Sequence, residues 1–150
     1  MRTRRRGRAP SSRSAMGLTL AELLTVLAIV ATLSALALPT YLQQQRKVRR
    51  GDARAALQQM QFDQVRYRNS HNRFASTPAE LGWALDLSPQ GHYRLLLTEA
   101  YADSYTAEAI PVGPQAADTA CNPLRMAWRD VATVVYSSGP SPDSDPTPCW

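Results

Sequence analysis

Glu22 is the acidic residue with the most unusual surroundings in this sequence. It is the only charged residue in the apolar run from Leu18 to Leu38, which is 21 residues long. A carboxylate in lipid is costly, so such a residue is normally paired with a cation. The run contains none, but a newly made α-amino group at Leu18, or the amino group of a neighbouring subunit, would supply one. The alternative is that Glu22 lies near a helix end and reaches the membrane interface.

The two cysteines, Cys121 and Cys149, are the second candidate for chemistry. A zinc site would need help from His71 or His92, which are far upstream. A single disulfide in an oxidising compartment is the simpler interpretation. Closing a loop of this size stabilises a fold by about 3–4 kcal/mol in the chain-entropy model.

No combination of residues indicates catalysis. The sequence has no glycine-rich phosphate loop, GxSxG motif or His-Glu-x-x-His motif. His71 and His92 are single histidines in polar surroundings, where a surface or capping role is preferred. Asp143 and Asp145 could bind calcium through oxygen atoms, but a solvated pair is the preferred interpretation. We therefore expect a protein that is not an enzyme, without a cofactor or metal.

The positive charge is concentrated at the start of the chain. Six of the seventeen basic residues lie before Gly17, and the first 21 residues contain no acid. Removal of residues 1–17 would leave eleven basic and twelve acidic side chains, a net charge of −1. The remaining chain therefore has no bulk electrostatic signature of nucleic-acid binding.

Four arginines could still gather into a local DNA-binding surface. They are Arg66, Arg68, Arg73 and Arg94. Trp128 or Trp150 could stack on bases beside them. Because the remainder of the chain is nearly neutral, a solvated helix face is preferred, and DNA is retained as the weaker alternative partner.

The elements that position these residues begin with a membrane-length segment. Residues 18–38 are long enough to cross the hydrocarbon layer as a helix, and arginines precede them, as the positive-inside rule requires. A secretory signal peptide cleaved near Ala35 and Ala37 is one alternative, and a plain signal anchor is another. The apolar run is longer than a signal peptide needs, and a signal anchor leaves Glu22 unexplained.

The remainder of the sequence predicts an α+β domain. Residues 42–68 have an apolar helical stripe, so residues 18–68 are expected to form one long helix, with a kink or melted stretch at Pro39. A short helix or turn is expected over about 78–84, because Thr77, Pro78 and Glu80 fit the start of a helix. Four strand-like runs follow, and short connections favour antiparallel pairing. They cover 92–98, 104–110, 124–128 and 132–136. The tail from Ser138 is expected to be irregular.

The residues Gly17-Leu-Thr-Leu-Ala-Glu22 and the apolar run after them resemble the class III signal of type IV pilins. The similarity continues through Leu38-Pro39-Thr40-Tyr41, where pilins have a helix-bending proline followed by an aromatic residue. The resemblance implies that prepilin peptidase cuts after Gly17, and that the new N-terminus at Leu18 is N-methylated. Phe is the usual first residue of the mature protein, so Leu18 departs from the family pattern.

The resemblance also implies an organisation. Residues 1–17 would be the leader, 18–68 the long helix with a membrane or filament-core part at 18–38, and 69–150 the globular head. The fold would be a long N-terminal helix packed on a small antiparallel sheet of about four strands. A C-terminal loop bounded by Cys121 and Cys149 would match the D-region of pilins.

The function implied is that of a structural subunit, with a minor pilin as the first interpretation, in a type IV pilus that supports adhesion, twitching motility or DNA uptake. A major pilin, a type II secretion pseudopilin and a DNA-receptor competence pilin are the alternatives. The expected partners are other pilin subunits, prepilin peptidase, the inner-membrane pilus assembly machinery and membrane lipid. The subunit would cross the inner membrane once, with its head in the periplasm, and then join the pilus on the cell surface. Glu22 and Pro39 are the residues expected to act in assembly.

Overall fold

The protein is described by a computed structural model that covers residues 17, 19–130 and 133–150. The chain divides after Pro39 into two compact units. Leu18 and most of the expected leader lie outside the described residues. Gly17 is described and is exposed, in a segment without regular secondary structure.

Helix α1 extends from Leu20 to His71, a length of 52 residues, and it contains Pro39 without a break. Its start is a capping box, in which two side chains satisfy backbone donors that a helix leaves free. Thr19 Oγ1 accepts a hydrogen bond from the Glu22 N–H at 3.2 Å, and Glu22 Oε2 accepts one from the Thr19 N–H at 2.9 Å. In the described residues, α1 is the one helix long and apolar enough to cross a membrane, with a mean hydropathy of 2.2 in its best window.

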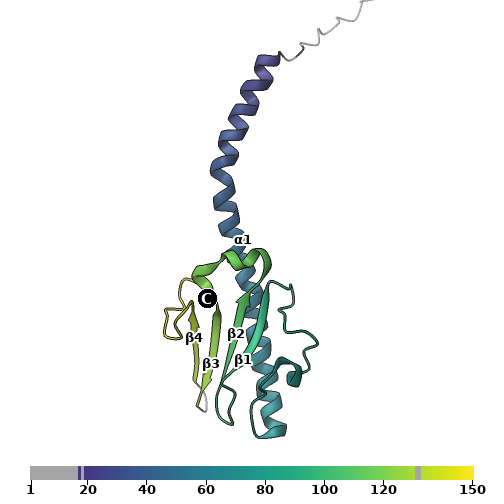
Figure 1. Ribbon diagram of the computed structural model, residues 1–150, viewed down its shortest axis with the longest axis vertical. Helices are drawn as coiled ribbons and strands as arrows, with labels where there is room; N and C mark the ends of the chain where they lie inside the picture. The colour runs from purple at the N-terminus through teal and green to yellow at the C-terminus, as the bar shows by residue number, and fades with distance from the viewer. Residues whose placement is uncertain (1–16, 18, 131–132) are drawn as a thin grey trace, which may run out of the picture. The chain divides into compact units, whose positions relative to one another are not determined.

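The second unit consists of the later part of α1 and a four-stranded antiparallel sheet in the order β1-β2-β3-β4 (Figure 1). The strands are β1 (Tyr93–Thr98), β2 (Tyr105–Pro111), β3 (Leu124–Arg129) and β4 (Thr133–Ser138). The 3-10 helices η1 (Pro78–Leu81), η2 (Gly113–Ala117) and η3 (Thr119–Cys121) lie in the connections. The expected α+β class and antiparallel sheet are confirmed.

The core lies between α1 and one face of the sheet. Small residues line both sides, including Ala53 and Ala56 on α1 and Ala107 and Ala109 on β2, all fully buried. Larger side chains fill the remaining space by alternating along the strands, as the period of a β-strand requires. They include Leu57, Met60, Phe74, Tyr93, Leu95, Tyr105, Leu124 and Met126. This packing holds the later part of α1 against the sheet, so the end of α1 has a fixed position relative to the ends of the strands.

Three buried charged residues attach α1 to the loops of the head. Asp52 accepts hydrogen bonds from the Ser88 hydroxyl at 2.5 Å and the Gln90 N–H at 3.1 Å. Asp63 accepts one from Trp83 Nε1 at 3.0 Å. Arg50, which the sequence presents only as part of a basic cluster, is 9 % exposed and is described below. Buried charges of this kind are stable only when they are paired and hydrogen-bonded.

Several elements differ by a few residues from the expected bounds, and α1 ends at His71 rather than at residue 68. The short helix or turn expected over 78–84 is a four-residue 3-10 helix, which Gly82 ends with a φ of 87°, in the left-handed region. Strand β4 was expected to end at Tyr136, but it continues to Ser138, because Ser137 and Ser138 pair with Arg125 and Leu124 of β3. Both serines are buried, so backbone pairing overrides their preference for turns.

Candidate functional site

The C-terminal tail is fastened to α1 by the disulfide and by two arginines. Cys121 and Cys149 form the expected disulfide, with a Cα–Cα distance of 5.6 Å. Arg50 makes two hydrogen bonds to the carboxylate of Asp118, at 2.7 and 2.8 Å, and donates a third to the Pro148 carbonyl. The bond to Asp118 raises the pKa of the Arg50 guanidinium above its ordinary value. Arg54 donates to the Cys149 carbonyl at 3.1 Å. These contacts make the tail part of the folded head.

The last turn of α1 forms one side of a hollow at the end of the head where β1 and β3 also end (Figure 1). Its volume is about 410 Å³. We call it the basic hollow and define it by its lining: Val65, Arg68, Asn69, Asn72, Phe74 and Trp128. Val65, Arg68 and Asn69 share one face of α1, because helical neighbours on a face are three or four positions apart, and Asn72 directly follows the helix.

Asn72 shapes this hollow through the backbone. It follows the last residue of α1 with a φ of 54°, and its N–H donates to the Arg68 carbonyl at 2.9 Å. Asparagine and glycine end helices in this left-handed conformation with little strain. The chain then turns back, so that Phe74 faces the sheet with its ring centroid 4.7 Å from that of Tyr105 and 6.2 Å from that of Trp128.

Arg68 differs from the other arginines expected to form a DNA surface. Its guanidinium lies over the Phe74 ring, 4.9 Å from the centroid, and it makes no ion pair with any described residue. Each of the other three expected arginines is paired with a carboxylate. The pairs are Arg66 with Asp63 at 3.2 Å, Arg73 with Glu80 at 2.9 Å, and Arg94 with Asp86 at 3.5 Å. Arg94 belongs to β1 and does not line the basic hollow. The structure therefore leaves Arg68 as the one uncompensated cation of the four.

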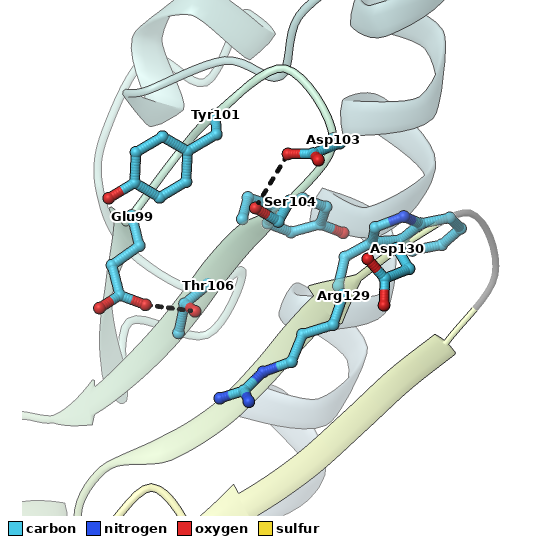
Figure 2. Close-up of a pocket in the computed structure, with 9 residues that line it drawn as sticks. Glu99, Tyr101, Asp103, Ser104, Thr106, Arg129 and Asp130 are labelled. Carbon is cyan, nitrogen blue, oxygen red and sulfur yellow. Dashed lines mark hydrogen bonds between the residues drawn. The ribbon is translucent and has the colours of Figure 1, made fainter.

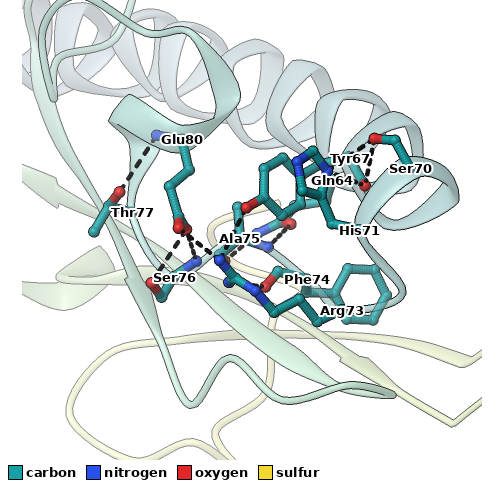
Figure 3. A network of polar contacts seen from close by, with 10 residues as sticks. All are labelled: Gln64, Tyr67, Ser70, His71, Arg73, Phe74, Ala75, Ser76, Thr77 and Glu80. Atoms are coloured by element: carbon teal, nitrogen blue, oxygen red, sulfur yellow. Dashed lines mark hydrogen bonds and ion pairs between the residues drawn. The ribbon is translucent and has the colours of Figure 1, made fainter.

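Arg73 belongs to a network that holds the loop after α1 (Figure 3). It donates to Glu80 Oε1 and to the Tyr67 hydroxyl at 3.0 Å. Glu80 also accepts from the Ser76 N–H at 2.6 Å, and the bonds from Arg73 and Ser76 lower the pKa of Glu80 to about 2. Gln64 fixes the same loop by two hydrogen bonds to the backbone of Ala75.

A second hollow, of about 270 Å³, lies between the β1–β2 turn and the end of β3 (Figure 2). We call it the acidic hollow because three carboxylates line it, against one guanidinium from Arg129. The carboxylates belong to Glu99, Asp103 and Asp130. Glu99 and Asp130 have φ values of 52° and 58°, in the left-handed region, which is uncommon for residues other than glycine. This arrangement repels a phosphate, in contrast to the basic hollow.

Trp128 lines both hollows and is partly buried. Its Nε1 is buried and has no acceptor among the described residues. An unpaired buried donor destabilises a fold by about 1–3 kcal/mol relative to a satisfied one. Its ring is nearly parallel to that of Tyr105, at 6.4 Å between centroids. The indole therefore separates two surfaces of opposite charge.

The remaining residues singled out in the sequence lie elsewhere. Glu22 is engaged with Thr19, as described above. His71 stacks on Tyr67 at 4.0 Å and its Nδ1 contacts the Tyr67 carbonyl at 3.0 Å, so it caps the end of α1. Trp150 packs on Tyr136 and donates to the Ser137 carbonyl, which places it on the β4 side rather than in the basic hollow. Among the described residues, no group of acids, histidines or cysteines is arranged to hold a metal ion.

Sequence reasoning missed Asn69 and Asn72 as site residues. Both lie just beyond residue 68, where the expected helix ends. The signal available was their spacing from Arg68 at the end of an amphipathic stripe.

A sequence model of one protein family, described as "Type IV minor pilin ComP, DNA uptake sequence receptor", matches residues 39–125. The match covers 87 of 150 residues, which is more than half of the chain. The chain belongs to this family. It is therefore a type IV pilus subunit of the minor pilin class, which associates with other pilin subunits and the pilus machinery. The expectation of a type IV minor pilin is confirmed.

The matched segment of this ComP-family pilin includes the later part of α1, most of the basic hollow, the strands β1 and β2, and the first two residues of β3. Trp128 lies three residues beyond its end. The N-terminal apolar helix fits membrane anchoring and a pilus on the cell surface. No individual curated protein matches the chain.

Proposed function

We propose that this ComP-family pilin is a DNA receptor, whose head binds duplex DNA at the basic hollow. The observation that carries the proposal is the family match, because the family is described as a DNA uptake sequence receptor. The position of Arg68 supports it, since a cation without an acidic partner is available for a phosphate or a base. The chain after residue 17 has a net charge of only −1, but a local cation beside amide side chains can contact DNA without a basic domain.

We also propose that the subunit reaches the filament by the pilin route. Prepilin peptidase would remove residues 1–17, methylation would follow at Leu18, and residues 18–38 would cross the inner membrane once with the head, residues 69–150, in the periplasm. The capping box supports the role of Glu22, because its carboxylate already binds the Thr19 N–H, one residue from the new amine. A neighbouring subunit's amine could replace that contact in the filament. The role of the chain would be structural and not catalytic.

The DNA proposal is tested with the processed full-length protein in detergent and a fluorescent duplex of mixed sequence. Arg68→Gln is compared with Arg94→Gln, because each removes one positive charge but Arg94 is already paired with Asp86. We expect about tenfold weaker binding for Arg68→Gln and little change for Arg94→Gln. Equal losses would indicate a general charge effect, and absence of saturable binding by the wild type at low salt would overturn the proposal.

Intact mass tests the processing proposal. Mature protein should begin at Leu18 and carry one methyl group, and Gly17→Ala should impair removal of the leader. A wild-type protein that keeps its arginine-rich start, or that begins after Ala37, would contradict the pilin route.

A further inference from the structure

We propose that the basic hollow reads base edges in a DNA groove through the amides of Asn69 and Asn72 and the guanidinium of Arg68, while Arg66 and Arg73 contact the backbone. This inference rests on the proposed DNA binding. It adds a division of labour, in which one group of residues determines which sequence binds and another determines how tightly any sequence binds.

The first argument is that the three side chains are available. Asn69 and Asn72 are exposed, and neither amide makes a side-chain hydrogen bond to a described residue. Arg68 is held only by its contact with the Phe74 ring. Arg68 and Asn69 lie in the last turn of α1 and Asn72 directly follows it, and all three line one hollow, so a single base step could meet them together.

The second argument is chemical. An amide is neutral and cannot compensate a phosphate, but it offers a donor and an acceptor side by side, which match N6 and N7 of adenine. The arginine fork matches O6 and N7 of guanine. A hollow that combines two free amides with one free guanidinium is therefore better suited to base edges than to backbone.

The third argument concerns Arg66 and Arg73. Their side chains are 76 % and 48 % exposed, and each forms a surface ion pair with a nearby acid. Asp63 is buried and Glu80 is partly exposed, but both guanidinium groups are open to solvent, so each can contact a phosphate without leaving its acid. These residues can hold the backbone on either side of the reading face without contributing sequence information.

The acidic hollow supplies the fourth argument, because it restricts how the duplex can lie. Glu99, Asp103 and Asp130 repel phosphates on the far side of Trp128. The backbone is therefore directed to the α1 side, and a groove faces Asn69 and Asn72. A defined orientation is required for any side chain to read a fixed base position.

The test is selection from a randomised duplex pool by the full-length processed protein in detergent. Wild type is compared with Asn69→Ala and with Asn72→Gly, in which glycine keeps the left-handed backbone and removes only the amide. Gln58→Ala is the matched control, because Gln58 is an exposed amide on the same helix that does not line the hollow. Thermal melting of each variant checks that its head is folded.

We expect wild type and Gln58→Ala to enrich the same sequences. Asn69→Ala and Asn72→Gly should each lose preference at one or two positions, with about tenfold less discrimination there and an unchanged salt dependence. Arg66→Gln should weaken every sequence and reduce the slope of log affinity against log salt by about 1, with no change in preference.

Two failures are distinguishable. If the wild type binds DNA but the Asn69 and Asn72 variants enrich the same sequences as the wild type, base reading by this hollow is wrong and the DNA-receptor proposal stands. If the wild type binds no duplex, the proposed function itself fails.

Discussion

The two hollows that Trp128 lines have opposite charge. The basic hollow is built from a helix end, with an uncompensated guanidinium and two free amides. The acidic hollow is built from a strand turn and a strand end, with three carboxylates against one guanidinium. The difference teaches that a nearly neutral domain can carry a local preference for an anion where a cation has no carboxylate beside it.

The contrast between the two hollows depends on which arginines form ion pairs with carboxylates. Five arginines each have a carboxylate within 4 Å, so they add little to the electrostatic potential farther away. They are Arg50, Arg66, Arg73, Arg94 and Arg125. A count of arginines therefore overstates the basic surface, and of the four arginines expected to bind DNA only Arg68 has no carboxylate partner among the described residues. The variants below change the basic hollow and the acidic hollow separately.

Reversing the charge of the basic hollow should have the largest effect. Arg68→Glu replaces the free cation by an anion, so attraction is lost and repulsion is added. We expect duplex affinity to fall about 100-fold, with a shallower salt dependence. The measurement is a fluorescence titration at several salt concentrations. An affinity within threefold of wild type would show that DNA does not approach this side.

Neutralising the acidic hollow should have a smaller effect of opposite sign. Asp103→Asn and Asp130→Asn together remove two negative charges, and asparagine tolerates the left-handed backbone at position 130. We expect affinity to rise about threefold at low salt and discrimination between sequences to fall, because the duplex gains alternative orientations. A higher affinity with unchanged discrimination would mean that these acids do not orient the DNA.

Releasing Arg73 from Glu80 should change duplex affinity less than the variants above, but it should also change how stability depends on pH. Glu80 has a pKa of about 2 in the folded protein against 4.5 as its ordinary value. A lowered folded pKa means that its stabilisation is complete above about pH 4.5 and is lost as pH falls toward 2.

Glu80→Gln should therefore remove part of the acid sensitivity of the melting temperature between these pH values. It should also raise duplex affinity about twofold at neutral pH, because the Arg73 charge is no longer compensated. Melting curves from pH 2 to 7 provide the measurement, with Asp86→Asn as the control that frees Arg94 outside the hollow. Identical acid profiles for wild type and Glu80→Gln would contradict the assigned contact.

The sequence predicted the parts of this fold that depend on short-range patterns. The strands β1 to β3 follow from alternation in segments such as Tyr105–Pro111, and the disulfide follows from a cysteine count of two. The Thr77–Glu80 cap was also predicted correctly as the start of a short helix. There the Thr77 hydroxyl accepts from the Glu80 N–H at 3.3 Å, although the Glu80 carboxylate turns to Ser76 instead.

Long-range pairing could not be predicted in the same way. Arg50 meets Asp118, which is 68 positions away, and no local pattern distinguishes this buried arginine from the partly buried Arg49. The same is true of Arg68, because its lack of a partner depends on where every acid of the head comes to lie. By contrast, the Thr19–Glu22 capping box was readable, since a Thr-x-x-Glu pattern before an apolar run is a helix-start signal. The interpretation of Glu22 as a charge buried in lipid did not include this capping role.

Trp128→Phe should produce the smallest change, and it tests whether the wall between the hollows is only structural. Replacing the indole by the smaller phenyl ring leaves space in a packed site, which usually destabilises a fold. The change also removes a buried N–H that has no acceptor among the described residues, which stabilises the fold. The two effects oppose each other, so we expect the free energy of unfolding to change by less than about 1 kcal/mol. Phenylalanine keeps the separation of the two charged surfaces, so duplex affinity should stay within about twofold of wild type. Trp128→Ala removes the ring between the two hollows and joins the acidic hollow to the basic one. It should therefore lower the free energy of unfolding and the duplex affinity by more than Trp128→Phe does. Chemical denaturation and the duplex titration together decide the matter: a large loss of affinity in a fully stable Trp128→Phe protein would mean that the indole N–H itself contacts DNA.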